Sequence, residues 1–153
     1  MYDVLVPVDE SEERAFNQAR YVSRLPNAAD DVEATVLYVV PPDARSDVEA
    51  VEFDDVAAAV GAANLLEGEG VSVTRTVTGG AISDRIVRSA GEFDADEVVM
   101  GGRKRSGVSR VLLGSTVQDV MLSAEQPVTI TGETSVTDDG TWRVLVPVDS
   151  DVE

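Results

Sequence analysis

Residues 98–116 have the sequence Val-Val-Met-Gly-Gly-Arg-Lys-Arg-Ser-Gly-Val-Ser-Arg-Val-Leu-Leu-Gly-Ser-Thr. The apolar residues at its start predict a buried strand, the Gly- and Arg-rich segment predicts a loop, and Gly114-Ser115 precedes an amphipathic helical pattern. A strand, a loop and a helix in this order form the repeating unit of an α/β fold. Because backbone N–H groups and the helix dipole attract anions at a helix start, the segment is also a candidate phosphate site.

The same stretch gathers positive charge in a very acidic chain. The protein has 12 basic and 29 acidic residues and a formal net charge of −17, and the only lysine is Lys104. Four of the basic residues nevertheless lie between Arg103 and Arg110, and no acidic residue occurs between Glu97 and Asp119. Cationic side chains add to the attraction for an anion. The alternative is a solvated loop that offsets local acidity or pairs with acidic residues of a partner subunit.

Strand and helix patterns alternate along the rest of the chain. Their order, β-α-β-α-β-α-β-α-β, predicts a single open parallel five-stranded sheet with helices on both faces, a Rossmann-like α/β fold. Ligands bind such sheets at the carboxyl ends of the strands. The turn at Asp9 and the loop at Gly101 are therefore expected to meet in one cleft. The predicted strands cover residues 2–8, 32–40, 71–77, 97–100 and 127–131, and the helical patterns begin near residues 12, 56, 82 and 115.

Composition limits the class of protein. A chain of 153 residues that is 43% hydrophobic is expected to form one globular core. Cysteine and histidine are absent, which excludes disulfides and removes the commonest general base. We recognise no signal peptide and no apolar run near the ~20 residues of a membrane span, so we expect a cytoplasmic protein without a membrane partner.

The acidic residues are spread over the whole chain rather than gathered in a tail. This distribution is typical of a salt-adapted surface, because high ionic strength screens the self-repulsion. The alternative is a surface that avoids polyanions or binds cations in an ordinary cell. Both interpretations disfavour nucleic acid as a partner, since phosphate contacts need a basic face.

One internal repeat occurs. The sequence Val-Leu-Val-Pro-Val-Asp of residues 4–9 returns identically at residues 144–149, after a polar linker. We therefore predict one domain at residues 1–132 and a tail at residues 133–153 that holds the linker and an extra strand. The strand would pair at a sheet edge, within the chain or with a partner, or would begin a truncated second copy of the domain.

Several motifs now resemble those of one family. They are the Val-Pro-Val-Asp that ends the first strand and is followed by Glu-Ser-Glu, the Leu37-Tyr38-Val39 that ends the second, and Met100-Gly101 with the downstream Gly114-Ser115. On these residues the chain resembles the universal stress protein family over residues 2–131, as a salt-adapted, haloarchaeal-type member. The resemblance implies an adenine nucleotide alpha hydrolase-like fold.

The ATP-binding members of that family carry Gly, two residues, Gly, nine residues and then Gly-Ser or Gly-Thr. Gly101 and Gly114-Ser115 keep the outer spacing, but Lys104 occupies the middle glycine position. A glycine there permits positive φ or a close approach of backbone to phosphate, and lysine tolerates positive φ poorly. Lys104 either contacts a β- or γ-phosphate with its side chain or fills the site and blocks it.

The resemblance also implies which residues would hold ATP. The end of the first strand would line the base and ribose, with the Asp9 carboxylate accepting ribose hydroxyls and weakly contacting an accompanying Mg²⁺. Backbone at the end of the second strand would meet adenine, basic side chains would lie by the phosphates, and the helix start would donate to them. The implied set is Pro7, Val8, Asp9, Val39, Met100, Gly101, Arg103, Lys104, Gly114, Ser115 and Thr116.

Purely structural roles compete with these assignments. Asp9 is also suited to bonding the N–H groups of its own turn. Ser115, with Gln118 three residues on, matches a capping box. Met100 is also suited to a place in the core.

The function expected from the resemblance is a small regulatory or sensing protein of the stress response, homodimeric and with an unidentified protein partner. The alternative is an interaction module of the same fold that binds no nucleotide. An enzyme is the least favoured hypothesis. The chain lacks a P-loop motif, and Asp9 alone has an obvious position for Mg²⁺, so at most a slow ATPase is expected.

Overall fold

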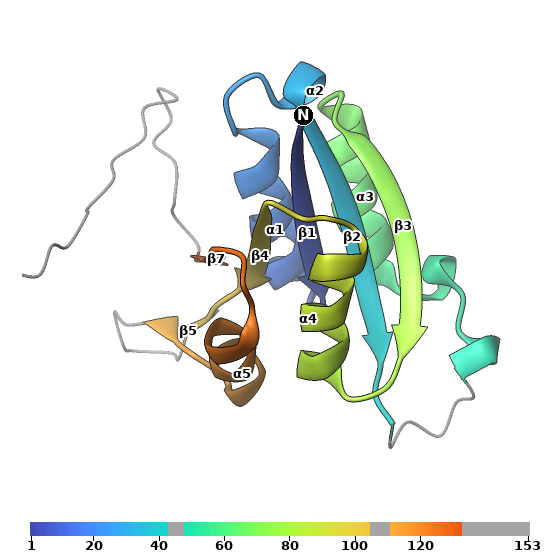
Figure 1. Cartoon of the computed structure of the whole chain (residues 1–153). Helices are drawn as coiled ribbons and strands as arrows, with labels where there is room; N and C mark the ends of the chain where they lie inside the picture. The colour runs from blue at the N-terminus through green and yellow to red at the C-terminus, as the bar shows by residue number, and fades with distance from the viewer. Residues whose placement is uncertain (43–47, 105–110, 133–153) are drawn as a thin grey trace, which may run out of the picture.

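The structure is a computed structural model that describes residues 1–42, 48–104 and 111–132. Its centre is a five-stranded parallel sheet with the strand order β3-β2-β1-β4-β7 (Figure 1). The predicted fold class is therefore confirmed. The strands are β1 (Tyr2–Val8), β2 (Val32–Val40), β3 (Ser72–Gly79), β4 (Glu97–Gly101) and β7 (Val128–Thr131).

Helices cover both faces of the sheet (Figure 1). On one face α1 (Glu12–Ser23) packs against α3 (Ala57–Gly68), and on the other α4 (Ile82–Glu92) packs against α5 (Ser115–Ser123). Because successive side chains of a strand point to opposite faces, β1 contributes to both layers. Val4, Val6 and Val8 join the core beneath α1 and α3, while Leu5 joins the core beneath α4 and α5.

Short elements that the sequence analysis missed connect these layers. They include the helix α2 (Ala28–Asp31) and the two 3₁₀ turns η1 (Val48–Ala50) and η2 (Phe53–Asp55). A two-stranded antiparallel ribbon, β5 (Arg103–Lys104) with β6 (Val111–Leu112), stands where a loop was predicted. The apolar pair at 111–112 suits a strand, but a two-residue strand leaves too little pattern to recognise in a sequence.

The starts of two helices show different capping. The Ser11 hydroxyl accepts a hydrogen bond from the N–H of Arg14 at 3.3 Å, so Ser11 is the side-chain cap of α1. The capping-box prediction for Ser115 is wrong, because Gly114 is the N-cap and Ser115 is the first helical residue. The side-chain amide of Gln118 instead donates to the carbonyl of Leu113 at 3.0 Å.

A buried carboxylate lies at the amino-terminal edge of the sheet. Glu97, 4% exposed, accepts hydrogen bonds from the hydroxyls of Tyr2 and Tyr21, each at 2.9 Å, and from the hydroxyl of Thr129. Desolvation, aided by the Glu97 carboxylate, raises the pKa of Tyr2 to about 12. The cluster therefore ties β1, β4, β7 and α1 together on the side away from the carboxyl ends of the strands.

Two sequence predictions fall beyond these elements. The predicted extra strand, with the repeat at residues 144–149, lies outside the described residues. So do residues 105–110, which make up most of the basic segment. Within the described ranges, no helix is both long and apolar enough to cross a membrane.

Candidate functional site

A pocket of about 470 Å³ opens at the carboxyl edge of the sheet. It lies where β1 has β2 on one side and β4 on the other, which is the topological switch point at which such sheets bind ligands. The sequence prediction that the Asp9 turn and the Gly101 segment converge is thereby confirmed. Ten of the predicted residues line the pocket: Pro7, Val8, Asp9, Val39, Met100, Gly101, Arg103, Gly114, Ser115 and Thr116.

The eleventh predicted residue, Lys104, has its backbone in β5, and its side chain lies outside the described part of the chain. The pocket also contains side chains that the sequence analysis did not assign to it. They come from the turn between β1 and α1, from the first turns of α1, from the end of β2, and from α4 and α5. These residues are Glu10, Ser11, Arg14, Gln18, Tyr38, Pro41, Ile82, Ile86 and Val117.

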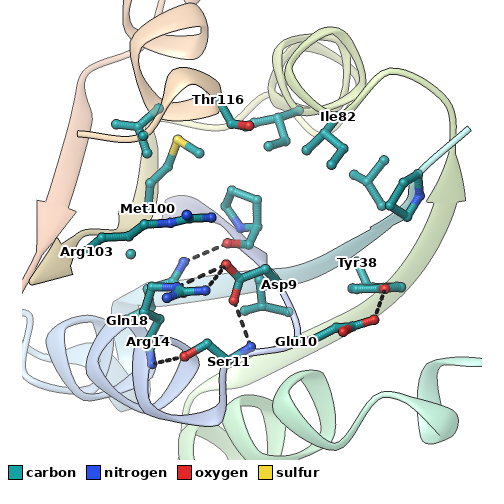
Figure 2. A pocket seen from close by; sticks show the side chains of 18 of the residues that line it. Asp9, Glu10, Ser11, Arg14, Gln18, Tyr38, Ile82, Met100, Arg103 and Thr116 are labelled. Carbon is teal, nitrogen blue, oxygen red and sulfur yellow. Dashed lines mark hydrogen bonds and ion pairs between the residues drawn. The ribbon is translucent and has the colours of Figure 1, made fainter. Parts of the chain in front are cut away.

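Asp9 is held by an ion pair. Its Oδ2 atom accepts hydrogen bonds from Nη2 of Arg14 at 2.6 Å and from Nε of Arg14 at 3.0 Å (Figure 2). Its Oδ1 atom accepts the N–H of Ser11 at 2.9 Å. The local turn interaction considered from the sequence is therefore present. The ion pair was missed, although a basic residue in the first turn of the following helix was a signal that could have suggested it.

Gln18 explains how the pocket opens. β1 and β4 pair only from Val4 to Leu5, and beyond that point the two strands separate. The buried amide of Gln18 donates to the carbonyls of Pro7, at 2.7 Å, and Val99, at 2.9 Å. Since a buried carbonyl without a partner costs about 1–3 kcal/mol, this amide satisfies the backbone where the strands diverge.

Glycine is needed at position 101 because a side chain would collide with α1, and not because the backbone angles are unusual. A Cβ atom at this position would lie 2.9 Å from Cβ of Arg14 and 3.2 Å from Oε1 of Gln18. The absence of a side chain thus lets α1 approach the end of β4. At Gly114 the nearest atom to an added Cβ would be Nε of Arg103, at 3.8 Å, so this glycine has room around it.

One end of the pocket is apolar. Tyr38 and Ile82 lie there, on the opposite side from Arg103 and Met100 (Figure 2). The Tyr38 hydroxyl donates to Oε1 of Glu10 at 3.4 Å. Burial, with the carboxylates of Glu10 and Asp9 in support, raises the pKa of Tyr38, so its hydroxyl remains a donor at neutral pH. This end suits a flat apolar ring that carries polar groups on its edge.

The other end can attract an anion. Arg103 lies beside Gly114 at the start of α5, where Ser115 and Thr116 also line the cavity. Gly114 provides no side-chain cap to the first N–H groups of this helix. N–H groups without an intrahelical partner, the positive end of the helix dipole and a guanidinium therefore act on the same space.

The next question is whether side chains near Asp9 could hold a metal ion. Among the described residues, no group of three or more metal-ligating side chains comes together. Both oxygens of Asp9 already accept hydrogen bonds from protein atoms. An ion that reached Asp9 would share these oxygens with Arg14 and with the N–H of Ser11.

Together these features define a small α/β protein of the open parallel-sheet class, with a ligand pocket that is apolar at one end and cationic at the other. The profile of the universal stress protein family matches residues 1–132. The chain therefore belongs to this family. No protein of curated function matches its sequence.

Solved structures agree on the fold. A universal stress protein from Archaeoglobus fulgidus is 27% identical, with a TM-score of 0.70 over 86% of this chain and 99% of that one. The universal stress protein from Archaeoglobus fulgidus in complex with dAMP is 24% identical, with a TM-score of 0.68 over 86% and 98%. A universal stress protein in complex with cAMP is 22% identical, with a TM-score of 0.62 over 87% and 98%.

Proposed function

We propose that this chain binds an adenine nucleotide, ATP, in the pocket at the carboxyl edge of the sheet and acts as a cytoplasmic regulator in the stress response. The observation that carries the proposal is the polarity of the pocket. An apolar end at Tyr38 and Ile82 faces a cationic end at Arg103 and the start of α5. A nucleotide has the matching polarity, with an aromatic base at one end and phosphates at the other.

The proposed contacts follow from this orientation. The backbone of Val39 meets adenine, and Asp9 accepts hydroxyl groups of the ribose. Arg103 contacts the phosphates, while Ser115 and Thr116 donate to them from the first turn of α5. Mg²⁺ enters only as the companion of ATP on its phosphates.

Two of the similar structures are complexes with dAMP and with cAMP. Those ligands belong to those proteins, and they make adenine nucleotides the first compounds to test here. A thermal unfolding series in molar potassium chloride is suitable, because a ligand that binds only the folded state raises Tm with its concentration. ATP should raise Tm of the wild type and raise it less in Arg103→Ala. The control Arg88→Ala, at an exposed position of α4 outside the pocket, should respond like the wild type.

A second candidate is an interaction module without a nucleotide. It is favoured by Lys104, which stands where the ATP-binding members carry a glycine. Under this candidate Lys104 blocks the phosphate site, and ATP leaves Tm unchanged in the wild type.

We also propose a homodimer. β7 is an edge strand, with β4 as its single neighbour in the described sheet. The preceding helix α5 exposes 87% of Leu122 and 47% of Met121. An open strand edge and exposed apolar side chains are both aggregation liabilities unless they are covered. Pairing with a second copy, aided by the tail at 133–153, would cover it.

A further inference from the structure

Arg14 occupies a position in the pocket for which the nucleotide motif has no assignment. The structure assigns Arg14 the role of a specificity-determining residue: by neutralising Asp9 it lets the pocket accept ligands that carry several phosphates, in preference to an uncharged nucleoside. This inference rests on the proposed nucleotide site and deepens it.

The position of Arg14 is fixed at several points. Its backbone N–H donates to the Ser11 hydroxyl, and its Cβ and Cδ atoms lie against Gly101. Its guanidinium reaches Asp9 through two hydrogen bonds, at 2.6 and 3.0 Å. The guanidinium is therefore held over the pocket floor, with the Arg14 side chain 29% exposed.

The charges of the pocket show why this matters. Within the described residues, the charged side chains that line it are Asp9, Glu10, Arg14 and Arg103. The two carboxylates and the two guanidinium groups give this lining a net charge of zero. Without Arg14 the pocket would hold an excess of one negative charge, in a chain that already carries −17. An unpaired carboxylate at this position would repel a nearby phosphate, although the Asp9 side chain is 51% exposed and solvent screens part of the repulsion.

Molar salt weakens this repulsion but leaves the contact between Arg14 and Asp9 in place. At molar ionic strength the screening length is about 3 Å. The contact between Arg14 and Asp9 is shorter, at 2.6 Å. The direct hydrogen bonds of the pair therefore persist, whereas repulsion between Asp9 and a more distant phosphate is partly screened.

Arg14 has a competing role that is purely structural, because its aliphatic stem packs on Gly101. The two roles differ in what they predict for a series of ligands. A structural defect would weaken adenosine, AMP, ADP and ATP by the same factor. A charge defect would weaken them progressively as phosphates are added, and would leave adenosine almost unaffected.

The experiment is calorimetric titration of these four ligands into the wild type and Arg14→Met, which keeps a long apolar stem. We expect adenosine affinity to change by less than about twofold and ATP affinity to fall by about tenfold or more. Arg14→Lys should keep most of the ratio of ATP to adenosine affinity. The matched control is Arg24→Met, at an exposed position beyond the other end of α1.

A double variant distinguishes the effect of the lost Arg14 charge from the effect of its lost packing contacts. Asp9→Asn combined with Arg14→Met removes both charges, and the ATP-to-adenosine ratio should return toward the wild-type value. Equal losses for all four ligands in Arg14→Met, or no loss at all, would overturn the role of Arg14 and leave the nucleotide site standing. A folded wild type that binds none of the four would overturn the nucleotide site and the inference together.

Discussion

A methyl group on Gly101 would lie 2.9 Å from Cβ of Arg14, which is closer than side-chain carbons approach one another in proteins. The end of β4 and the first turn of α1 are thus in direct contact at the floor of the pocket. The glycine of the family's nucleotide motif therefore has a packing role in this chain, whether or not phosphate lies nearby.

Gly101→Ala should lower the free energy of unfolding by about 1–3 kcal/mol, because α1 must shift to make room. Urea unfolding in molar salt measures the change. The control is Gly61→Ala in α3, where an added Cβ meets no atom within 4 Å. That substitution should stabilise the protein by up to about 1 kcal/mol, since alanine favours a helix. Equal effects of the two substitutions would contradict the packing role.

Gln18→Leu should lower the free energy of unfolding more than the same substitution of an exposed glutamine. It leaves the carbonyls of Pro7 and Val99 buried without their hydrogen bonds, at about 1–3 kcal/mol each. Gln118→Leu is the control, because Gln118 also donates to a carbonyl but is exposed. If denaturant midpoints fell equally in both variants, the account of how β1 and β4 separate would be wrong.

The tyrosine hydroxyls should ionise at a higher pH than that of free tyrosine. The chain has three, and the pKa of each is raised in the folded protein: Tyr2 to about 12, with Tyr21 and Tyr38 also above the usual 10.0. Absorbance at the phenolate band should therefore change little near pH 10 while the protein stays folded. An unperturbed tyrosine would be half ionised at pH 10, so about a sixth of the full change at that pH would show that one of the three is unperturbed.

The same shift has a consequence for stability. A tyrosine whose folded pKa exceeds its unfolded pKa stabilises the native state fully below the unfolded value, and the contribution is lost as pH rises through the folded value. For Tyr2 the loss falls between pH 10 and about 12. Tyr2→Phe should flatten the decline of Tm in that window, measured against the wild type. A decline as steep as in the wild type would remove Tyr2 as its cause.

Lys104→Gly distinguishes two roles for the substituted position of the motif. ATP affinity should fall if the Lys104 side chain contacts phosphate, and it should rise if that side chain fills the site. Calorimetry on the variant and on the wild type gives the sign. An unchanged affinity would contradict both roles.

The proposed dimer is tested at its exposed apolar residue. Leu122→Glu should shift the protein from dimer to monomer in light scattering, because a charge would have to be buried in the interface. Removal of residues 133–153 tests the tail separately. A dimer that survives the truncation but not Leu122→Glu would place the interface at β7 and α5 without the tail.

The sequence predicted the architecture well because the pattern of apolar residues is strong. Five β-branched segments alternate with helical patterns, and their carboxyl ends had to meet at one edge. Ten of the eleven predicted site residues lie in one pocket for that reason. Their contact with a nucleotide remains a prediction.

What the sequence did not predict depends on how elements pack. The pairing of Arg14 with Asp9 requires the first turn of α1 to lie over the end of β1. The buried place of Gln18 requires β1 and β4 to diverge. The N-cap of α5 was assigned to Ser115 instead of Gly114, because a capping box and a glycine cap one residue earlier differ only in local geometry.

The most direct test is calorimetric titration of ATP, with and without Mg²⁺, into the wild-type chain in molar potassium chloride. Binding in the micromolar range, about −8 kcal/mol, is the predicted result, and it should weaken in Arg103→Ala. No heat of binding from a protein shown to be folded would contradict the nucleotide site and favour the interaction module.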